Sequence, residues 1–573
     1  MLHDSDILMI DAIGPFFRHY KRKRINWSKI PFSEIETESG LRPECLASIP
    51  GDFRKFLQKA RTFGYNSLTL DDVAHLVPCD LYPEALQSKI SAYRELYREL
   101  FEIATEEGLR VFLTTDIMFY NDALKRRLGT NRKRVALWLR DALDGLLHDF
   151  PEIAGVIMRF GETDGLDVHG DFRSQLLLKR PSHARAFLEE LLPVFEQRER
   201  LLVFRTWSVG AHQIGDLIWN ERNFGRVFEG LDSPSLVISM KYGESDFFRY
   251  LALNKLFFAG DHKKIIELQA RREYEGFGAY PSFVGWDSEG YLRELSRAKN
   301  VVGASVWCQT GGWGKLRQLT FLRNSSKWVE MNVFVLARLW QGITCEEAIE
   351  AYREQHIPDV PGDVLTRFLD LSDQVIKELL YVREFAERHL YFRRLRLPPQ
   401  LFVFWDRIIV DHTMKKILAC LIREPEAAVV EGYGALEKLR EMQRIAKEHG
   451  LPTKGLKFQL ATFEIMAVAR EYFFRPYDEE NAGRLKGLKA DYRKRFKRNY
   501  SVMLDFSPTP VRRFHLRWLF ALFFRERSRY RLLDEVVTLR MVAWAYPVVK
   551  RLASRVSPDF AQNQAMGLET IFR

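Results

Sequence analysis

The stretch that decides the fold is residues 154–207. It begins with the apolar run AGVIMRF (Ala154–Phe160) and ends with a second run, LLVFRTW (Leu201–Trp207). Between them, HARAFLEELLPVFEQRE (His183–Glu199) repeats apolar residues at the spacing of an amphipathic helix. A strand, a helix and a second strand in this order predict one βαβ unit, with its two strands parallel in one sheet.

The same rhythm recurs through the first 325 residues. Eight short apolar or β-branched runs alternate with amphipathic stretches, and these runs are Ile7–Gly14, Ser67–Asp71, Leu109–Thr115, Ala154–Phe160, Leu201–Trp207, Leu236–Lys241, Ile265–Glu273 and Val301–Cys308. Eight such units predict an α/β protein with a closed (β/α)8 TIM barrel. An open doubly wound sheet is the alternative, but no GxGxxG follows the first run.

From about residue 326 the pattern changes to long helical stretches. VLTRFLDLSDQVIKELLYVREFAERHLYFRRL (residues 364–395) and LEKLREMQRIAKEHG (residues 436–450) are examples. We therefore predict two regions, a barrel over residues 1–325 and an all-α C-terminal domain over residues 326–573.

Composition and charge are those of a globular protein with one basic end. Of the 573 residues, 46% are hydrophobic and 28% charged, and the net charge is +11. Residues 491–560 hold 16 Lys and Arg against 6 Asp and Glu. This segment either contacts an anionic membrane surface or packs with a solvated basic face. Because the basic excess lies outside an acid-rich barrel mouth, we expect no nucleic-acid binding. A homodimer through the helical region stays open.

The cysteines and the N-terminus bear on the compartment. Five cysteines without a CxxC pair favour a reducing environment, and residues 1–15 lack the basic start of a signal peptide. We expect a cytoplasmic protein. With no HxH cluster, P-loop or GxGxxG, we expect neither a metal nor a cofactor.

Active-site residues of a barrel follow the carboxyl ends of its strands. Here those residues are acids, with cations and tryptophans between them: Asp116, Arg159, Glu162, Arg205, Trp207, Lys241, Asp246, Glu273, Glu275 and Trp307. Two carboxylates on different sides of a glycosidic bond serve as acid and base, and tryptophan rings suit the apolar faces of sugars. This pattern predicts a glycoside hydrolase acting on an oligosaccharide or glycan.

Two motifs resemble a known family. MKYGESDF (Met240–Phe247) and ELQARREY (Glu267–Tyr274) are similar to the VKNGxxDF and ELQxxxEY motifs of glycoside hydrolase family 67, the α-glucuronidases. The resemblance covers roughly residues 50–355, so the β-rich domain that precedes the barrel in that family is not expected here. It implies a barrel with a helical C-terminal region and an inverting reaction on a glycan that contains a uronic acid.

The resemblance also implies a role for each matched residue. Glu162 would be the general acid, while Asp246 and Glu273 would hold and deprotonate water. Lys241 and Arg205 would contact the substrate. From their places at the strand ends, and not from the resemblance, Arg159, Trp207, Asp116 and Trp307 are expected to line the site.

Some roles have alternatives. Glu275 is a rival of Glu273 but is expected to face outward, Arg205 could instead pair with Asp246, and Trp307 could belong to the core. The alternative function is that of a non-catalytic glycan-binding accessory protein, docked through its basic helical end on a membrane or a partner.

Overall fold

Eight parallel strands close into a barrel, as the alternating pattern predicts. The computed structural model describes residues 6–21, 29–161, 170–208, 212–311, 316, 318–392, 395–400, 402–404, 407–497, 499–511 and 524–526. The barrel strands are β1 (Ile7–Asp11), β2 (Ser67–Asp71), β3 (Arg110–Asp116), β5 (Ile153–Gly161), β7 (Leu201–Ser208), β8 (Leu236–Lys241), β9 (Lys263–Gln269) and β10 (Val301–Trp307). The barrel closes where β1 pairs with both β2 and β10.

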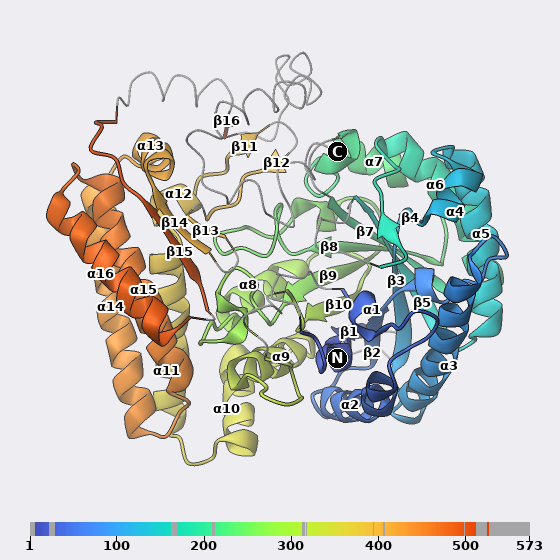
Figure 1. Ribbon diagram of the computed structural model, residues 1–573, viewed down its shortest axis with the longest axis horizontal. Helices are drawn as coiled ribbons and strands as arrows, with labels where there is room; N and C mark the ends of the chain where they lie inside the picture. Colours follow the sequence, from blue (N-terminus) through green and yellow to red (C-terminus); the bar gives the residue numbers. More distant parts are fainter. Residues whose placement is uncertain are drawn as a thin grey trace.

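Helices surround the barrel on its outer side (Figure 1). They are α2 (Pro43–Thr62), α3 (Glu84–Glu106), α4 (Asp122–Leu128), α5 (Arg132–Asp149), α6 (Pro181–Gln197), α7 (Glu221–Phe228), α8 (Gly285–Leu295) and α9 (Lys327–Trp340). The short helix α1 (Phe32–Ile35) belongs to the loop after β1 and lies near the middle of the barrel in this view. A short ribbon, β4 (Phe119–Tyr120) with β6 (Arg173–Ser174), joins two of the loops. Between β8 and β9 the chain forms the short 3-10 helix η4 (Lys255–Phe258).

The seventh strand ends earlier than its pattern predicts. β9 stops at Gln269, so Glu273 lies in the following loop rather than on the strand. Arg271 and Arg272 explain the early end, because their side chains bond outside the sheet: Arg271 to the carbonyls of Thr310, Gly311 and Leu316, and Arg272 to Glu275 and the carbonyl of Phe247.

The C-terminal region is helical, as predicted. It contains α10 (Cys345–His356), α11 (Gly362–Val375), α12 (Arg383–Ala386), α13 (His412–Leu421), α14 (Pro425–Glu448), α15 (Lys454–Phe474) and α16 (Glu479–Arg495). In Figure 1, α11, α14, α15 and α16 lie together on the side away from the barrel.

Two small three-stranded sheets accompany these helices, which the helical pattern does not predict. One consists of β11 (Tyr391–Phe392), β12 (Leu395–Arg396) and β16 (Phe524–Arg525), and the other of β13 (Val403–Phe404), β14 (Arg407–Asp411) and β15 (Ser501–Asp505). The sequence of β14, RIIVD, is β-branched, and its parallel partner β15 lies about 90 residues later in the chain.

One apolar core runs through both regions. α9 is buried along almost its whole length, and the Tyr65 hydroxyl, before β2, donates to the carbonyl of Val333 on α9 at 2.8 Å. On the other side, Tyr280 from the loop after β9 packs against Phe458 and Phe463 of α15, with ring centroids 5.6 Å apart in both pairs. The C-terminal helices therefore support a loop at the mouth of the barrel.

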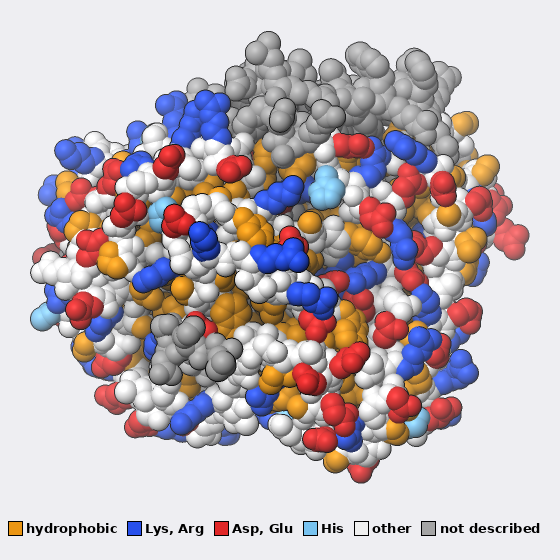
Figure 2. Space-filling view, turned by 180° about the vertical axis from the view of Figure 1, so that it is seen from behind, with side chains coloured by type: hydrophobic (Ala, Val, Ile, Leu, Met, Phe, Trp, Pro, Cys, Tyr) orange, Lys and Arg blue, Asp and Glu red, His pale blue; other side chains and the backbone are white. Residues whose placement is uncertain are grey.

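Charge on the visible surface is mixed. Figure 2 shows Lys and Arg interspersed with Asp and Glu over one face, with apolar side chains between them near its middle. No helix among the described residues is long and apolar enough to cross a membrane. Most of the basic segment 491–560 lies outside the described residues, so its membrane contact remains a prediction, as does a homodimer through the helices.

Candidate active site

The strand ends bring Lys241 and Asp246 together at the mouth of the barrel. Lys241 ends β8 and its ammonium binds the Oδ1 atom of Asp246. Asp246 also accepts hydrogen bonds from the Tyr274 hydroxyl at 2.7 Å and from the backbone N–H of Phe247 at 2.9 Å. Burial raises the pKa of Asp246, but the charge of Lys241 and these hydrogen bonds outweigh it and hold the pKa below its ordinary value. Asp246 is therefore ionised at neutral pH.

Glu273 lies on the neighbouring loop, in the opposite electrostatic situation. It is 7% exposed, and Gln269 at the end of β9 donates to its Oε1 atom at 2.9 Å. Burial and then the negative charge of Asp246 raise the pKa of Glu273 to about 7. The pKa of Asp246 is thus lowered and that of Glu273 is raised. Neighbouring carboxyl groups whose pKa values differ in this way are typical of an acid–base pair that shares one proton.

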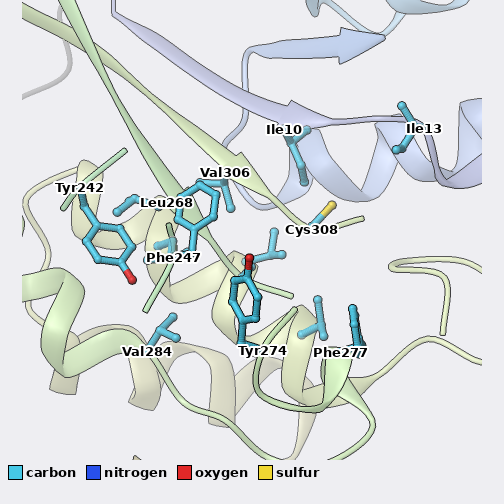
Figure 3. Close-up of a cluster of buried hydrophobic side chains, with 14 of the residues drawn as sticks. Ile10, Ile13, Tyr242, Phe247, Leu268, Tyr274, Phe277, Val284, Val306 and Cys308 are labelled. Carbon is cyan, nitrogen blue, oxygen red and sulfur yellow. The ribbon is translucent and has the colours of Figure 1, made fainter. Parts of the chain in front are cut away.

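Aromatic side chains form the surroundings of this pair. Figure 3 shows Tyr242, Phe247 and Tyr274, from the loops after β8 and β9, among apolar side chains that include Leu268 of β9 and Val306 of β10. Lys241 Nζ lies 3.5 Å from the centre of the Trp207 ring, near the end of β7. A cation held between a carboxylate and an indole is well fixed, so Trp207 lies at the candidate site.

Glu275 does not face outward, which corrects that expectation. It is completely buried, with its carboxylate bonded to Arg249, Arg272 and the Tyr381 hydroxyl. Burial raises its pKa, but the two guanidinium groups outweigh this and hold the pKa far below its ordinary value. Glu275 is a permanently ionised structural anion, so it is not a rival base to Glu273.

Arg205 pairs with Glu267, and its contact with a substrate stays a prediction. Its Nε donates to Glu267 of β9 at 2.8 and 3.0 Å, and its Nη2 donates at 2.9 Å, inside the barrel. Ser239 of β8 completes the group through a hydroxyl bond to Glu267 at 2.8 Å. The guanidinium lies 4.7 Å from the ring centre of Trp307, so Trp307 packs on this pair. The pairing of Arg205 with Asp246 is wrong.

Arg159 and Asp116 are brought together on the opposite side of the mouth. Arg159 Nε lies 2.9 Å from Asp116 Oδ1, and Lys29 from the loop after β1 binds the other Asp116 oxygen. Burial raises the pKa of Asp116, but the charges of Arg159 and Lys29 lower it below its ordinary value. Glu162 lies outside the described residues, and its position relative to Asp246 and Glu273 is a prediction.

Sequence reasoning missed several polar groups at these strand ends. Asp11, Lys29 and Asp71 belong to the mouth, where Asp71 accepts from the backbone N–H of Ile30 at 2.8 Å. Asp11 ends β1 and accepts from the backbone N–H of Gln309 at 2.9 Å, and burial raises its pKa to about 7. Asp71 was visible as the last residue of its predicted run, whereas Asp11 lies inside the predicted run Ile7–Gly14. Within the described residues, no group of His, Cys, Asp and Glu is arranged to hold a metal ion.

Comparison with known proteins identifies the fold and not a family. No family model matches the chain, and no curated protein matches it. Among solved structures, a GH138 enzyme targeting pectin rhamnogalacturonan II is similar over 87% of this chain and 63% of its own, with a TM-score of 0.53 and 11% identity. The chain thus spans less than two thirds of that enzyme.

Two further structures are less similar. A D-allulose 3-epimerase from Methylomonas sp. has 8% identity and a TM-score of 0.32, over 60% of this chain and 99% of its own. A full-length endo-β-1,4-glucanase from Bacillus halodurans has 13% identity and a TM-score of 0.31, over 51% of this chain and 55% of its own. At 11% identity the likeness to the GH138 enzyme concerns the fold alone.

Proposed function

We propose that this chain is an inverting glycoside hydrolase in which Asp246 and Glu273 hold and activate the attacking water. The observation that carries the proposal is the pair itself: a half-buried carboxyl group, Asp246, held ionised by Lys241, and a buried one, Glu273, with its pKa raised to about 7, after neighbouring strands. A general base works best when its pKa is close to the operating pH. Glu273 meets this condition, while Asp246 orients the water.

The leaving group needs a proton donor in addition to the base that activates the water. We assign this role to Glu162, just after β5, which the resemblance to α-glucuronidases supports. In inverting enzymes the acid and the base stand about 6.5–9.5 Å apart, which leaves room for one water between the base and the sugar. We place the sugar against Trp207 and Trp307. Lys241 and Arg159, which are paired with Asp246 and Asp116, would contact its hydroxyl oxygens.

The substrate class we propose is a glycan that contains a uronic acid or a related acidic sugar, as for an α-glucuronidase. The motifs around Asp246 and Glu273 support this class. The GH138 enzyme that shares the fold targets a pectin, which agrees with a glycan substrate.

The test is hydrolysis of aryl glycosides and uronic oligosaccharides by the full chain and its variants. We expect Glu273→Gln and Asp246→Asn each to lower kcat by about 10²- to 10⁴-fold, because each removes part of the water-activating pair. Glu294→Gln, on the exposed surface of α8, is the matched control and should retain full activity. NMR of the first-formed sugar anomer should show inversion.

Two results would redirect the proposal. If Glu273→Gln slows substrates with poor leaving groups far more than those with good ones, while Glu162→Gln leaves both unchanged, Glu273 is the acid and the base is Asp246. If the wild-type chain binds these glycans but hydrolyses none of them, it is the non-catalytic binding protein and not an enzyme.

A further inference from the structure

A buried arginine of the C-terminal region has hydrogen-bonding capacity that the described residues do not use. Arg396, on β12, is 2% exposed. Its Nη1 donates to the carbonyls of Leu390 and Leu397, both at 3.2 Å. Its Nε and Nη2 atoms have no hydrogen-bond partner among the residues that the structure describes. A buried cation with unused donors is costly, so an anion that fits the guanidinium would be bound favourably.

The charges around Arg396 do not neutralise it fully. Burial lowers its pKa below the ordinary value, and the nearby Tyr391 and Glu244 only partly oppose this. One oxygen of the Glu244 carboxylate, Oε2, accepts a hydrogen bond from the Tyr391 hydroxyl. The Nε and Nη2 side of a guanidinium presents two parallel N–H groups, which match the two oxygens of a carboxylate.

Arg396 lies beside the loop that carries Asp246. The Ser245 hydroxyl donates to the backbone carbonyl of Arg396 at 3.5 Å, and Glu244 on the same loop binds Tyr391 of the paired strand β11. The β11–β12 hairpin therefore sits directly against the residues that precede Asp246. A ligand at Arg396 would be next to the candidate acid–base pair.

Aromatic rings connect the two places. The Trp207 ring, under Lys241, packs against the cluster of Ile218, Trp219 and Tyr391. The ring centroids of Trp219 and Tyr391 are 5.0 Å apart, and the Arg396 guanidinium lies 5.5 Å from the Tyr391 ring centre. Trp219 and Tyr391 are buried, so these packed rings connect Arg396 to Trp207 at the candidate site.

The predicted cations of the mouth are already engaged. Arg205 is bonded to Glu267, Lys241 to Asp246 and Arg159 to Asp116. A substrate carboxylate at any of them would have to compete with a buried protein carboxylate. Among the described residues, Arg396 has no such competitor on Nε and Nη2.

We propose that Arg396 is an anion-binding residue of a second sugar subsite, formed where the β11–β12 hairpin meets the loops after β7 and β8, and that it binds the carboxylate of an acidic sugar unit. The role of this subsite rests on the proposed function: through Arg396, the C-terminal region would select acidic glycans for hydrolysis in the barrel.

The test is direct binding of D-glucuronate and D-glucose, a matched acidic and neutral pair, to the full chain by NMR titration. We expect the wild type to bind glucuronate more tightly than glucose. Arg396→Met removes the charge and both free donors and should weaken glucuronate binding at least about tenfold while leaving glucose binding unchanged. Arg396→Lys keeps the charge without the fork and should give an intermediate loss.

Arg470→Met is the control for the loss of a buried arginine. Arg470 is fully buried on α15 but donates to the carbonyls of Ala428 and Tyr381, so its loss should not change the preference for glucuronate. Equal binding of the two sugars by the wild type, or equal losses for both in Arg396→Met, would overturn the assignment. If Arg396→Met does not fold, Arg396→Lys decides. Binding is measured without turnover. A chain that hydrolyses no glycan but still prefers glucuronate would therefore contradict the proposed hydrolase function and not the assignment of Arg396.

Discussion

At the scale of single residues, the raised pKa of Glu273 depends on the charge of Asp246 in addition to burial. Asp246→Asn removes that charge and leaves Lys241 unpaired, and both changes favour the ionised form of Glu273. The pKa of Glu273 should therefore fall from about 7 toward its ordinary value of 4.5. A ¹³C-carboxyl NMR titration of wild type and variant measures this directly, and the ascending limb of any pH–rate profile in the wild type should have an apparent pKa near 7.

The control is Asp141→Asn, which removes a carboxylate paired with Arg140 on the exposed face of α5 and should leave the titration of Glu273 unchanged. The raised pKa of Glu273 also makes the stability of the fold depend on pH. The folded state holds a proton on Glu273 that the unfolded chain releases above about 4.5, so this group lowers the free energy of unfolding as the pH rises from 4.5 to about 7. An unchanged pKa in Asp246→Asn would mean that burial alone sets it.

At the scale of elements, the pair of Arg205 on β7 and Glu267 on β9 joins two strands through the inside of the barrel. Arg205→Met should lower the free energy of unfolding by about 3–5 kcal/mol, because Glu267 would remain buried without its cation. The double variant Arg205→Met with Glu267→Gln should recover at least half of this loss, since a neutral side chain still accepts the bond from Ser239. Urea unfolding measures both. A fully stable Arg205→Met protein with a raised KM would instead make Arg205 a substrate ligand.

The same elements explain what sequence can and cannot predict here. The barrel strands were predictable because each is a short apolar run between amphipathic stretches, and Lys241 and Asp246 lie at and just after the end of such a run. Glu273 was predicted as the last residue of its run but lies in the loop after β9. The partners of the buried charged residues were not predictable. Glu267 lies inside the run IIELQ, and only the barrel register aims it at Arg205. Glu275 is buried because Arg249 and Tyr381, distant in sequence, converge on it.

At the scale of the whole molecule, a buried ionic cluster ties the C-terminal helices to the loops of the candidate site. Asp373 on α11 accepts from Arg249 Nη1 at 2.8 Å and from Lys377 at 2.8 Å, while Arg249 also holds Glu275 and, at 2.9 Å, Asp287 on α8. Arg249 is three residues from Asp246, so the helical region fixes the loop that bears it.

Asp373→Ala should therefore affect the entire chain. Removing one member of a buried ionic cluster costs about 3–5 kcal/mol, and because one apolar core runs through barrel and helices, the loss should shift a single unfolding transition to lower temperature. Calorimetry with circular dichroism measures this. Glu426→Ala, which breaks an exposed pair with Arg475 inside the helical region, should leave the transition unchanged. Two unfolding transitions, of which Asp373→Ala shifts only one, would contradict this expectation. They would show that residues 1–325 and 326–573 unfold as separate domains. The helices would then support the candidate site without sharing the stability of the barrel.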